Sequence, residues 1–228
     1  MSDRKRGAAA VTAEQFLALE YIPRSVLLAK RVTDIVVALA GLVLTAPLWP
    51  LVALAIRLDS PGPAIYRQLR VGRMLTDRTE LFMILKFRSM RADAERGTGA
   101  VWAQRHDPRI TRVGAFIRRT RLDELPQLIN VLRGDMAVVG PRPERPAMYR
   151  RLEQAVPYFA DRTAGLRPGV TGLTQVVQGY DSSVEDVRRK VGLDAAYAMR
   201  LASFRGWLAS DTAIMLRTLN VMASGRGQ

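Results

Sequence analysis

The sequence of 228 residues contains no cysteine and a single histidine, His106. The absence of cysteine excludes a disulfide framework, a thiolate metal site and a cysteine nucleophile. One histidine excludes a multi-histidine zinc site and argues against a Ser-His-Asp triad, because His106 would have to serve alone. Any metal ion should therefore be a hard cation bound by oxygen atoms, and Mg²⁺ is the first candidate.

Lysine and aromatic residues are also scarce, although the chain is strongly basic. Only four of the 35 basic residues are lysines, and the formal net charge is +14. Such a balance suits an anionic partner, which could be nucleic acid, anionic lipid or a phosphorylated substrate. Aromatic residues make up 7% of the chain, and no groove-reading motif is present, so a nucleic-acid-binding protein is disfavoured.

The longest uncharged stretch covers residues 35–56 and would span about 33 Å as a straight helix, enough to cross a bilayer. Basic residues flank both ends of this stretch, so the positive-inside rule does not indicate which end would cross the membrane. Pro47 predicts a sharp break after Ala46, because proline removes a backbone hydrogen bond and clashes with the preceding turn. A straight span and a buried helix of a soluble protein stay open as alternatives. A re-entrant helix, which enters and leaves by the same leaflet, is favoured because it satisfies both flanks.

The chain is expected to divide into three parts. Residues 1–22 are polar and alanine-rich and predict a loosely held, flexible extension, while residues 23–58 form the membrane element. Residues 59–228 then form one folded domain. Within it, two runs at 64–71 and 81–87 are typical of strands and predict a β-hairpin. With helical patterns elsewhere, we expect a mainly α-helical fold with a small β-hairpin.

An acidic pair, Asp123 and Glu124, stands in a stretch that is otherwise arginine and apolar residues. The apolar residues from Leu125 onward recur at i, i+3, i+4 and i+7, which predicts an amphipathic helix that Gly134 ends. One interpretation of the pair is structural, with Asp123 as the N-cap of this helix and its neighbour favouring the helix dipole. The other interpretation is a functional pair of carboxylates.

Three segments carry a resemblance to a known family: KFRSM at 86–90, the run at 107–143 and RPGVTGLTQV at 167–176. Together they resemble the bacterial sugar transferases, the monotopic phosphoglycosyl transferases that start polysaccharide and glycoconjugate assembly. The resemblance covers about residues 30–221. It implies transfer of a phospho-sugar from a UDP-sugar to a polyprenol phosphate such as undecaprenyl phosphate, with Mg²⁺ and release of UMP. The expected location is the cytoplasmic face of the bacterial plasma membrane, with residues 59–228 as the catalytic domain carrying interfacial helices.

The resemblance also implies roles for individual residues. Asp123 would be the nucleophile that forms a phospho-sugar aspartyl intermediate, and Glu124 would help to hold Mg²⁺ with Asp123 or assist the acceptor phosphate. Neighbouring arginines and a helix N-terminus are expected to keep Asp123 charged. Lys86 and Arg142 match positions expected to contact phosphate. Further candidates for phosphate or nucleotide contacts are Arg88, Arg119, Arg167 and Gln175.

The sequence departs from the family pattern at two places. Ala46 stands where relatives often have serine, so proline alone is expected to make the break. Thr174 stands where many relatives have an aromatic residue, and the Gly-Arg pair that many carry near Gly179-Tyr180 is missing, so the donor sugar need not be that of familiar members.

The short N-terminal region suggests a minimal catalytic form. The sequence identifies neither the sugar nor the length of the polyprenol, and it does not determine whether the chain forms homo-oligomers. The alternative function is a non-catalytic membrane scaffold that binds anionic lipid.

Overall fold

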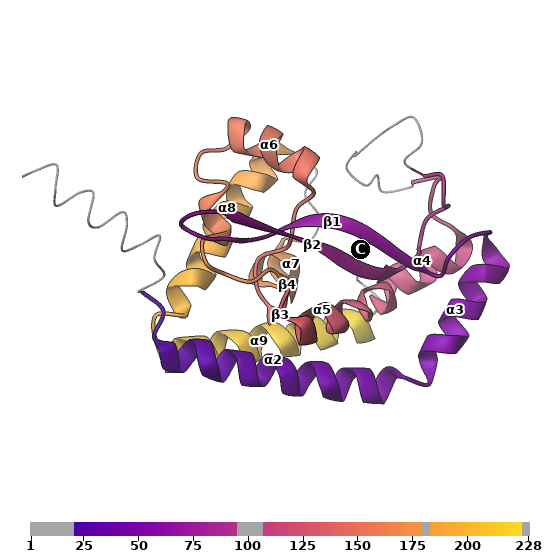
Figure 1. The fold of residues 1–228 in the computed structure, drawn as a ribbon, viewed down its shortest axis with the longest axis horizontal. Coiled ribbons are helices and arrows are strands. Elements are labelled where there is room, and N and C mark those ends of the chain that lie inside the picture. The colour runs from indigo at the N-terminus through magenta and orange to yellow at the C-terminus, as the bar shows by residue number, and fades with distance from the viewer. Residues whose placement is uncertain (1–20, 95–106, 179–182, 225–228) are drawn as a thin grey trace, which may run out of the picture.

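The computed structural model describes residues 21–94, 107–178 and 183–224. The predicted extension at 1–22 lies almost wholly outside the described residues, as does Gly179-Tyr180. In the described part, the fold is mainly helical, with an antiparallel pair of strands and a separate parallel pair (Figure 1). The mainly α-helical fold with a small hairpin is therefore confirmed, and the parallel pair is an addition that the sequence did not predict.

The apolar stretch forms two helices separated by a sharp bend. Helix α2 spans Arg24–Thr45, helix α3 spans Leu48–Asp59, and their axes differ by 65°. Pro47 occupies the N-cap of α3, where its missing N–H costs no helical hydrogen bond, so the predicted break is confirmed. Among the described helices, none is by itself long and apolar enough to cross a bilayer, whereas α2 and α3 meet that criterion together as a bent pair.

Proline is not the only residue that shapes the break. The Thr45 hydroxyl donates to the Gly41 carbonyl at 2.7 Å and accepts from the indole N–H of Trp49 at 3.3 Å. Thr45 therefore bridges the last turn of α2 and the first turn of α3. The expectation that proline acts alone is wrong, because a threonine hydroxyl one position before Ala46 supplies the local hydrogen bonds.

Helix α2 is fastened to the rest of the domain by buried charged groups. The Asp34 carboxylate accepts from the Val138 N–H at 2.8 Å, and Lys30 lies 3.7 Å from Asp34 and 2.9 Å from Asp211. The Tyr197 hydroxyl donates to Asp211 at 2.9 Å. Buried apolar residues of α2, the 131–139 segment and the two C-terminal helices surround these groups and form the main core. One face of α2 is thus fixed against the domain.

The predicted hairpin is confirmed and is longer than the sequence pattern indicated. Strand β1 spans Ile65–Met74 and pairs with β2, which spans Thr79–Phe87. Tyr66 lies opposite Lys86 in the register. Because side chains alternate between the faces of a strand, Tyr66, Gln68, Arg70 and Lys86 share one face.

The remaining elements wrap around this hairpin and α2. They are α4 (Arg112–Arg119), the 3₁₀ turn η1 (Leu122–Glu124), α5 (Gln127–Arg133), β3 (Ala137–Val139), α6 (Pro146–Ala155), the 3₁₀ turn η2 (Asp161–Thr163), β4 (Gly169–Thr171), α7 (Leu173–Val177), α8 (Val184–Arg200) and α9 (Phe204–Ala223). Strands β3 and β4 form the parallel pair. In Figure 1, α9 lies along the same side of the molecule as α2.

The structural interpretation of the acidic pair is wrong. Pro126 occupies the N-cap of α5, and no side chain caps that helix. Asp123 and Glu124 lie in η1, which Arg121 introduces with a left-handed backbone conformation of φ 56°. Gly134 ends α5 with φ 90°, as predicted, because glycine adopts this conformation without strain. Asp123 and Glu124 are therefore positioned by the turn η1, which precedes α5, and neither residue caps that helix.

Candidate functional site

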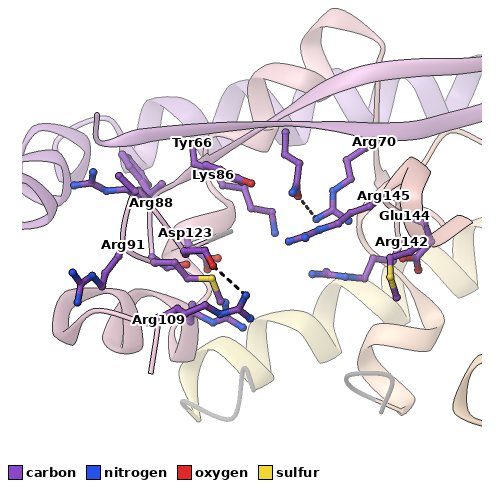
Figure 2. A pocket seen from close by; sticks show the side chains of 18 residues that line it. Tyr66, Arg70, Lys86, Arg88, Arg91, Arg109, Asp123, Arg142, Glu144 and Arg145 are labelled. Atoms are coloured by element: carbon purple, nitrogen blue, oxygen red, sulfur yellow. Dashed lines mark hydrogen bonds between the residues drawn. The ribbon is translucent and has the colours of Figure 1, made fainter. Parts of the chain in front are cut away.

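A cavity of about 350 Å³ lies beside the hairpin and is lined by Tyr66, Gln68, Arg70 and Lys86 of its strands (Figure 2). This volume is within the range of small-molecule sites, about 300–1,000 Å³. In the described residues, its lining includes two acidic side chains, Asp123 and Glu144, and a larger basic set. The basic lining residues are Arg70, Lys86, Arg88, Arg91, Arg109, Arg118, Arg142 and Arg145. Such an excess of positive charge in a hollow favours a phosphorylated ligand.

Local structure explains how α4 contributes to this wall. The Thr111 side chain caps the helix by accepting from the Gly114 N–H at 3.0 Å. A Cβ atom at Gly114 would lie 2.0 Å from the Ser89 carbonyl oxygen, so only glycine allows α4 to pack this closely against the segment after β2. This close approach carries Arg118 to the edge of the cavity.

Glu124 is the centre of a cluster of cations. Its carboxylate lies 3.1 Å from the Lys86 ammonium, 3.4 Å from the Arg142 guanidinium and 3.6 Å from the Arg121 guanidinium. Burial alone would raise the pKa of Glu124, but these three cations outweigh it and lower the pKa below its ordinary value. Glu124 is therefore an ionised group that holds Lys86 and Arg142 in place beside Asp123.

Asp123 has a different environment, although it is the adjacent residue. It lines the cavity, and among the described residues the ion pairs of the acidic pair all go to Glu124. Burial raises the pKa of Asp123 and outweighs the opposing effect of Lys86, while the charge of Glu124 raises it further. The sequence predicted that arginines and a helix N-terminus would favour the charged form. The neighbouring cations do lower the pKa, but burial outweighs them and raises it to about 6.

The loop that carries Arg142 is fixed from beneath by a second buried charge network. The Arg162 guanidinium donates to the Arg142 carbonyl at 3.2 Å and to the Asp194 carboxylate at 2.8 Å. Glu144 forms ion pairs with Lys190 and, at 3.7 Å, with Arg162. These contacts connect the loop to η2 and α8, so the backbone at Arg142 is held rigidly at the cavity wall.

The structure brings Lys86, Asp123, Glu124 and Arg142 together, as the resemblance implied. Arg88 also borders the cavity, but its guanidinium donates to the carbonyls at positions 60 and 61, both at 2.6 Å. It therefore ties the end of β2 to the turn that follows α3.

Three other candidates do not line the cavity. Arg119 is exposed on α4, and Arg118 takes the place expected of it. Arg167 donates to the Gly134 carbonyl at 2.9 Å, and Gln175 donates to the Val170 carbonyl at 3.1 Å. These two residues fix the segments around β4.

Sequence reasoning missed five arginines of the cavity, which are Arg70, Arg91, Arg109, Arg118 and Arg145. Alternation along β1 places Arg70 on the face of Lys86, but only once the register of the hairpin is known. Arg145 directly precedes α6 as its N-cap residue, and its position depends on the fold of the loop. No local pattern distinguished these residues from the many other arginines.

The described residues contain no group of three or more acidic or histidine side chains that could bind a metal ion. The acidic pair supplies two carboxylates, of which Glu124 is already surrounded by cations. Mg²⁺ is often bound by one or two carboxylates together with substrate phosphates and water. Asp123, at the cavity wall, fits that mode of binding.

Comparison with known proteins identifies relatives of this chain. The sequence profile described as "Bacterial sugar transferase" matches residues 25–225. The UDP-glucose:undecaprenyl-phosphate glucose-1-phosphate transferase of Caulobacter vibrioides is 44% identical over 201 residues, which cover 87% of this chain and 71% of that protein. The UDP-N-acetylgalactosamine-undecaprenyl-phosphate N-acetylgalactosaminephosphotransferase of Aeromonas hydrophila is 41% identical over 198 residues, which cover 87% of this chain and 44% of that protein.

A third relative is a Bacillus subtilis protein that is 53% identical over 133 residues, or 58% of this chain and 72% of that protein. Its name assigns it only provisionally as an undecaprenyl-phosphate N-acetylgalactosaminyl 1-phosphate transferase. This chain thus spans less than half of the Aeromonas protein and a larger share of the other two. With the profile matched along nearly its whole length, the chain belongs to the bacterial sugar transferase family.

Proposed function

We propose that this chain is a phosphoglycosyl transferase that moves a phospho-sugar from a UDP-sugar to undecaprenyl phosphate and releases UMP. The names of the Caulobacter and Aeromonas relatives describe the same type of transfer for those proteins. The observation that carries the proposal is a buried carboxylate, Asp123, in the wall of a strongly cationic cavity. Attack on a diphosphate needs an anionic nucleophile and cations that neutralise the phosphate oxygens.

The proposed reaction has two steps on Asp123. In the first, a carboxylate oxygen of Asp123 forms a bond to the sugar-linked phosphorus, and the bond from that phosphorus to the bridging oxygen breaks. The electron pair stays on the bridging oxygen, which leaves as part of UMP. In the second, a phosphate oxygen of undecaprenyl phosphate attacks the same phosphorus and frees the Asp123 carboxylate. Lys86 and Arg142, both held by Glu124, would neutralise oxygens of the donor diphosphate.

We propose Mg²⁺ as the metal ion of this reaction. Asp123 and Glu124 offer the carboxylate oxygens, and because the described residues hold no larger acidic group, substrate phosphates and water would take the other ligand positions. When bound, the ion would reduce the negative charge of the diphosphate.

We further propose that the bent pair α2–α3 is re-entrant and that the catalytic domain lies at the cytoplasmic face of the plasma membrane. Support comes from the outer faces of both helices, where Leu44, Leu51 and Leu58 have exposed fractions of 78%, 64% and 79%. Helix α9, which lies on the same side as α2 in Figure 1, exposes Leu216 and Leu219. An enzyme whose acceptor is a membrane lipid requires an apolar surface that can contact the membrane.

The experiment that tests the proposed function is UMP release from a panel of UDP-sugars with undecaprenyl phosphate and Mg²⁺. The variants are Asp123→Asn and, as a matched control, Asp77→Asn, which changes an exposed carboxylate in the hairpin turn. We expect wild type and Asp77→Asn to release UMP from at least one donor, and Asp123→Asn to be about 1,000-fold slower or worse. The active donor also identifies the sugar. A scaffold would release no UMP, and equal rates for Asp123→Asn and wild type would contradict the mechanism.

A further inference from the structure

Three arginines converge on the part of the cavity that lies beyond Lys86. Arg70 extends from β1, while Arg142 and Arg145 come from the loop before α6, and all three line the cavity. In Figure 2, their side chains approach the same space from one side, while Lys86 and Asp123 approach it from the other. A ligand in this space would contact groups from both sides.

Arg70 is held in this position by neutral partners. Its guanidinium donates to the Pro143 carbonyl at 3.0 Å and to the side-chain oxygen of Gln68 at 2.8 Å. Its Nε–H is buried without a hydrogen-bond partner. No ion pair joins Arg70 to an acidic side chain within the described residues, so its charge is oriented by the protein without being locally paired.

The charges of the three arginines repel one another. Burial, together with the charges of Arg142 and Arg145, lowers the pKa of Arg70 to about 10, against the opposing effect of Glu144. The Glu144 carboxylate is itself committed to Lys190 and Arg162. Because repulsion between partly buried cations is costly, an anion that binds between them would stabilise this arrangement.

Arg142 connects this cluster to the acidic pair. It lies 3.4 Å from Glu124, and its charge acts on both Asp123 and Arg70. A diphosphate has two phosphoryl groups next to each other. One can therefore lie beside Asp123 and Lys86 while the other lies among the three arginines.

The proposed first step places new negative charge on one of these two groups. When the bond between the bridging oxygen and the sugar-linked phosphorus breaks, the electron pair remains on the nucleotide phosphate. That phosphate then changes from a diester-like monoanion to a monoester with up to two negative charges. Positive groups fixed at this phosphate stabilise the transition state more than the ground state, because the charge appears during the reaction.

We propose that Arg70, Arg142 and Arg145 form the subsite for the nucleotide-side phosphate of the donor and stabilise UMP as the leaving group. The inference rests on the proposed function and adds two residues, Arg70 and Arg145, to the substrate-binding groups. The acceptor also carries a phosphate monoester, so the test must separate the two sources of this group.

The test measures the affinity of UMP for purified wild type and for Arg70→Gln and Arg145→Gln by calorimetry. Arg67→Gln is the matched control, because Arg67 is exposed on the opposite face of the same strand. The second arm measures the KM for a short-chain polyprenyl phosphate in detergent. Since Arg70 also bonds the Pro143 carbonyl, the melting temperature of each variant is compared with that of wild type. Arg145→Gln probes the same subsite from another element of the fold.

We expect UMP to bind about tenfold or more weakly to both cluster variants and equally well to wild type and Arg67→Gln. The KM for the acceptor should change less than the UMP affinity. Unchanged UMP affinity in Arg145→Gln and Arg70→Gln, or a rise confined to the acceptor KM, would overturn the subsite. Failure of the proposed function is distinguishable, since it would be seen as absence of UMP release by wild type in the same preparation.

Discussion

Glu124 forms ion pairs with Lys86, Arg142 and Arg121, whereas Asp123, one residue earlier, faces the cavity. The two carboxylates have the same chemistry, but their environments move their pKa values in opposite directions. Such a division is typical of catalytic pairs in which one group reacts and the other organises its surroundings. At the residue scale, the site therefore consists of one carboxylate that lines the cavity and one that holds the cations.

Glu144 permits a test of the charge network beneath the Arg142 loop. Burial raises its pKa, but Lys190 and Arg162 outweigh burial and lower it to about 2 from an ordinary value of 4.5. A carboxyl whose pKa is lowered by folding stabilises the protein above its unfolded pKa and loses that contribution as the pH falls toward the folded pKa. We expect Glu144→Gln to lower the free energy of unfolding at pH 7 by roughly 3 kcal/mol, because it leaves buried cations without this partner.

The measurement is denaturant unfolding in detergent at several pH values between 7 and 2. Wild type should lose stability as the pH falls through the window from about 4.5 to 2, and Glu144→Gln should lose less over the same window. Glu153→Gln, an exposed change on α6, should follow wild type. Parallel pH profiles for wild type and Glu144→Gln would show that Glu144 does not have the assigned role.

At the scale of elements, the bent pair α2–α3 is anchored on its inner side and apolar on its outer side. The Arg31 guanidinium donates to the carbonyls of Val131 and Leu132 at 2.7 and 2.9 Å, which are among the last carbonyls of α5. These contacts satisfy groups that a helix C-terminus leaves without internal partners. The end of α5 and the first half of α2 are therefore fastened together, and these contacts help to set the direction in which α2 leads into the break.

The bend can be tested by labelling, because the chain has no cysteine and single cysteines can be introduced into it. We propose Ser25→Cys, in the first turn of α2, and Thr76→Cys, in the hairpin turn; both positions are exposed. For a re-entrant pair, a membrane-impermeant maleimide added to intact cells should label neither cysteine, and lysis should expose both. External labelling of Ser25→Cys alone would show a straight span instead.

Pro47 and Pro50 should determine whether Ser25→Cys is labelled from outside the cell. Replacing Pro47 and Pro50 by alanine restores backbone N–H groups and allows a continuous helix over residues 24–59, about 54 Å long. We expect external labelling of Ser25→Cys to appear in this variant. The same labelling pattern with and without the prolines would contradict their assigned role.

How far the sequence predicted each element depends on whether the signal was local. Alternation predicted the hairpin, and proline predicted the break between α2 and α3. The 3₁₀ turn η1 was not predicted from the sequence. The residue that precedes it in a left-handed conformation is Arg121, and arginine, unlike glycine or asparagine, does not indicate that conformation. Strands β3 and β4 have only three residues each and form through long-range pairing, so no periodicity could reveal them.

The same distinction holds for the candidate site. The resemblance indicated Asp123, Glu124, Lys86 and Arg142, and these residues do lie together. The place of Arg70 requires the strand register, which depends on the turn and on packing. Thr174, noted as a departure from the family pattern, donates to Asp194 inside the buried charge network, a contact that joins α7 to α8 and is invisible in the sequence.

The molecule as a whole combines a net charge of +14 with an apolar surface on α2, α3 and α9. Both features favour a membrane with anionic lipids, but they respond differently to salt. At 1 M salt the screening length is about 3 Å, so attraction between charges is largely removed while apolar burial persists. The proposed membrane position therefore predicts association that survives high salt.

We expect wild type to remain bound to vesicles of anionic and neutral phospholipids at 1 M salt in a flotation assay. The double variant Leu44→Ser, Leu51→Ser should bind more weakly by about 4 kcal/mol, because two leucine side chains no longer enter the apolar layer. Leu81→Ser with Met83→Ser is the matched control, since these exposed residues lie on the hairpin. Release of wild type by salt, or equal effects of both double variants, would contradict the proposed position.

The most direct test of the central claim is capture of the intermediate on Asp123. Wild type is incubated with the active UDP-sugar, labelled at the sugar-linked phosphate, and with Mg²⁺ but no acceptor, and the protein is analysed by intact mass and peptide mapping. We predict one phospho-sugar per chain on the peptide that contains Asp123, its loss on addition of undecaprenyl phosphate, and no adduct in Asp123→Asn. Turnover by wild type with no adduct, or an adduct that persists in Asp123→Asn, would contradict Asp123 as the nucleophile.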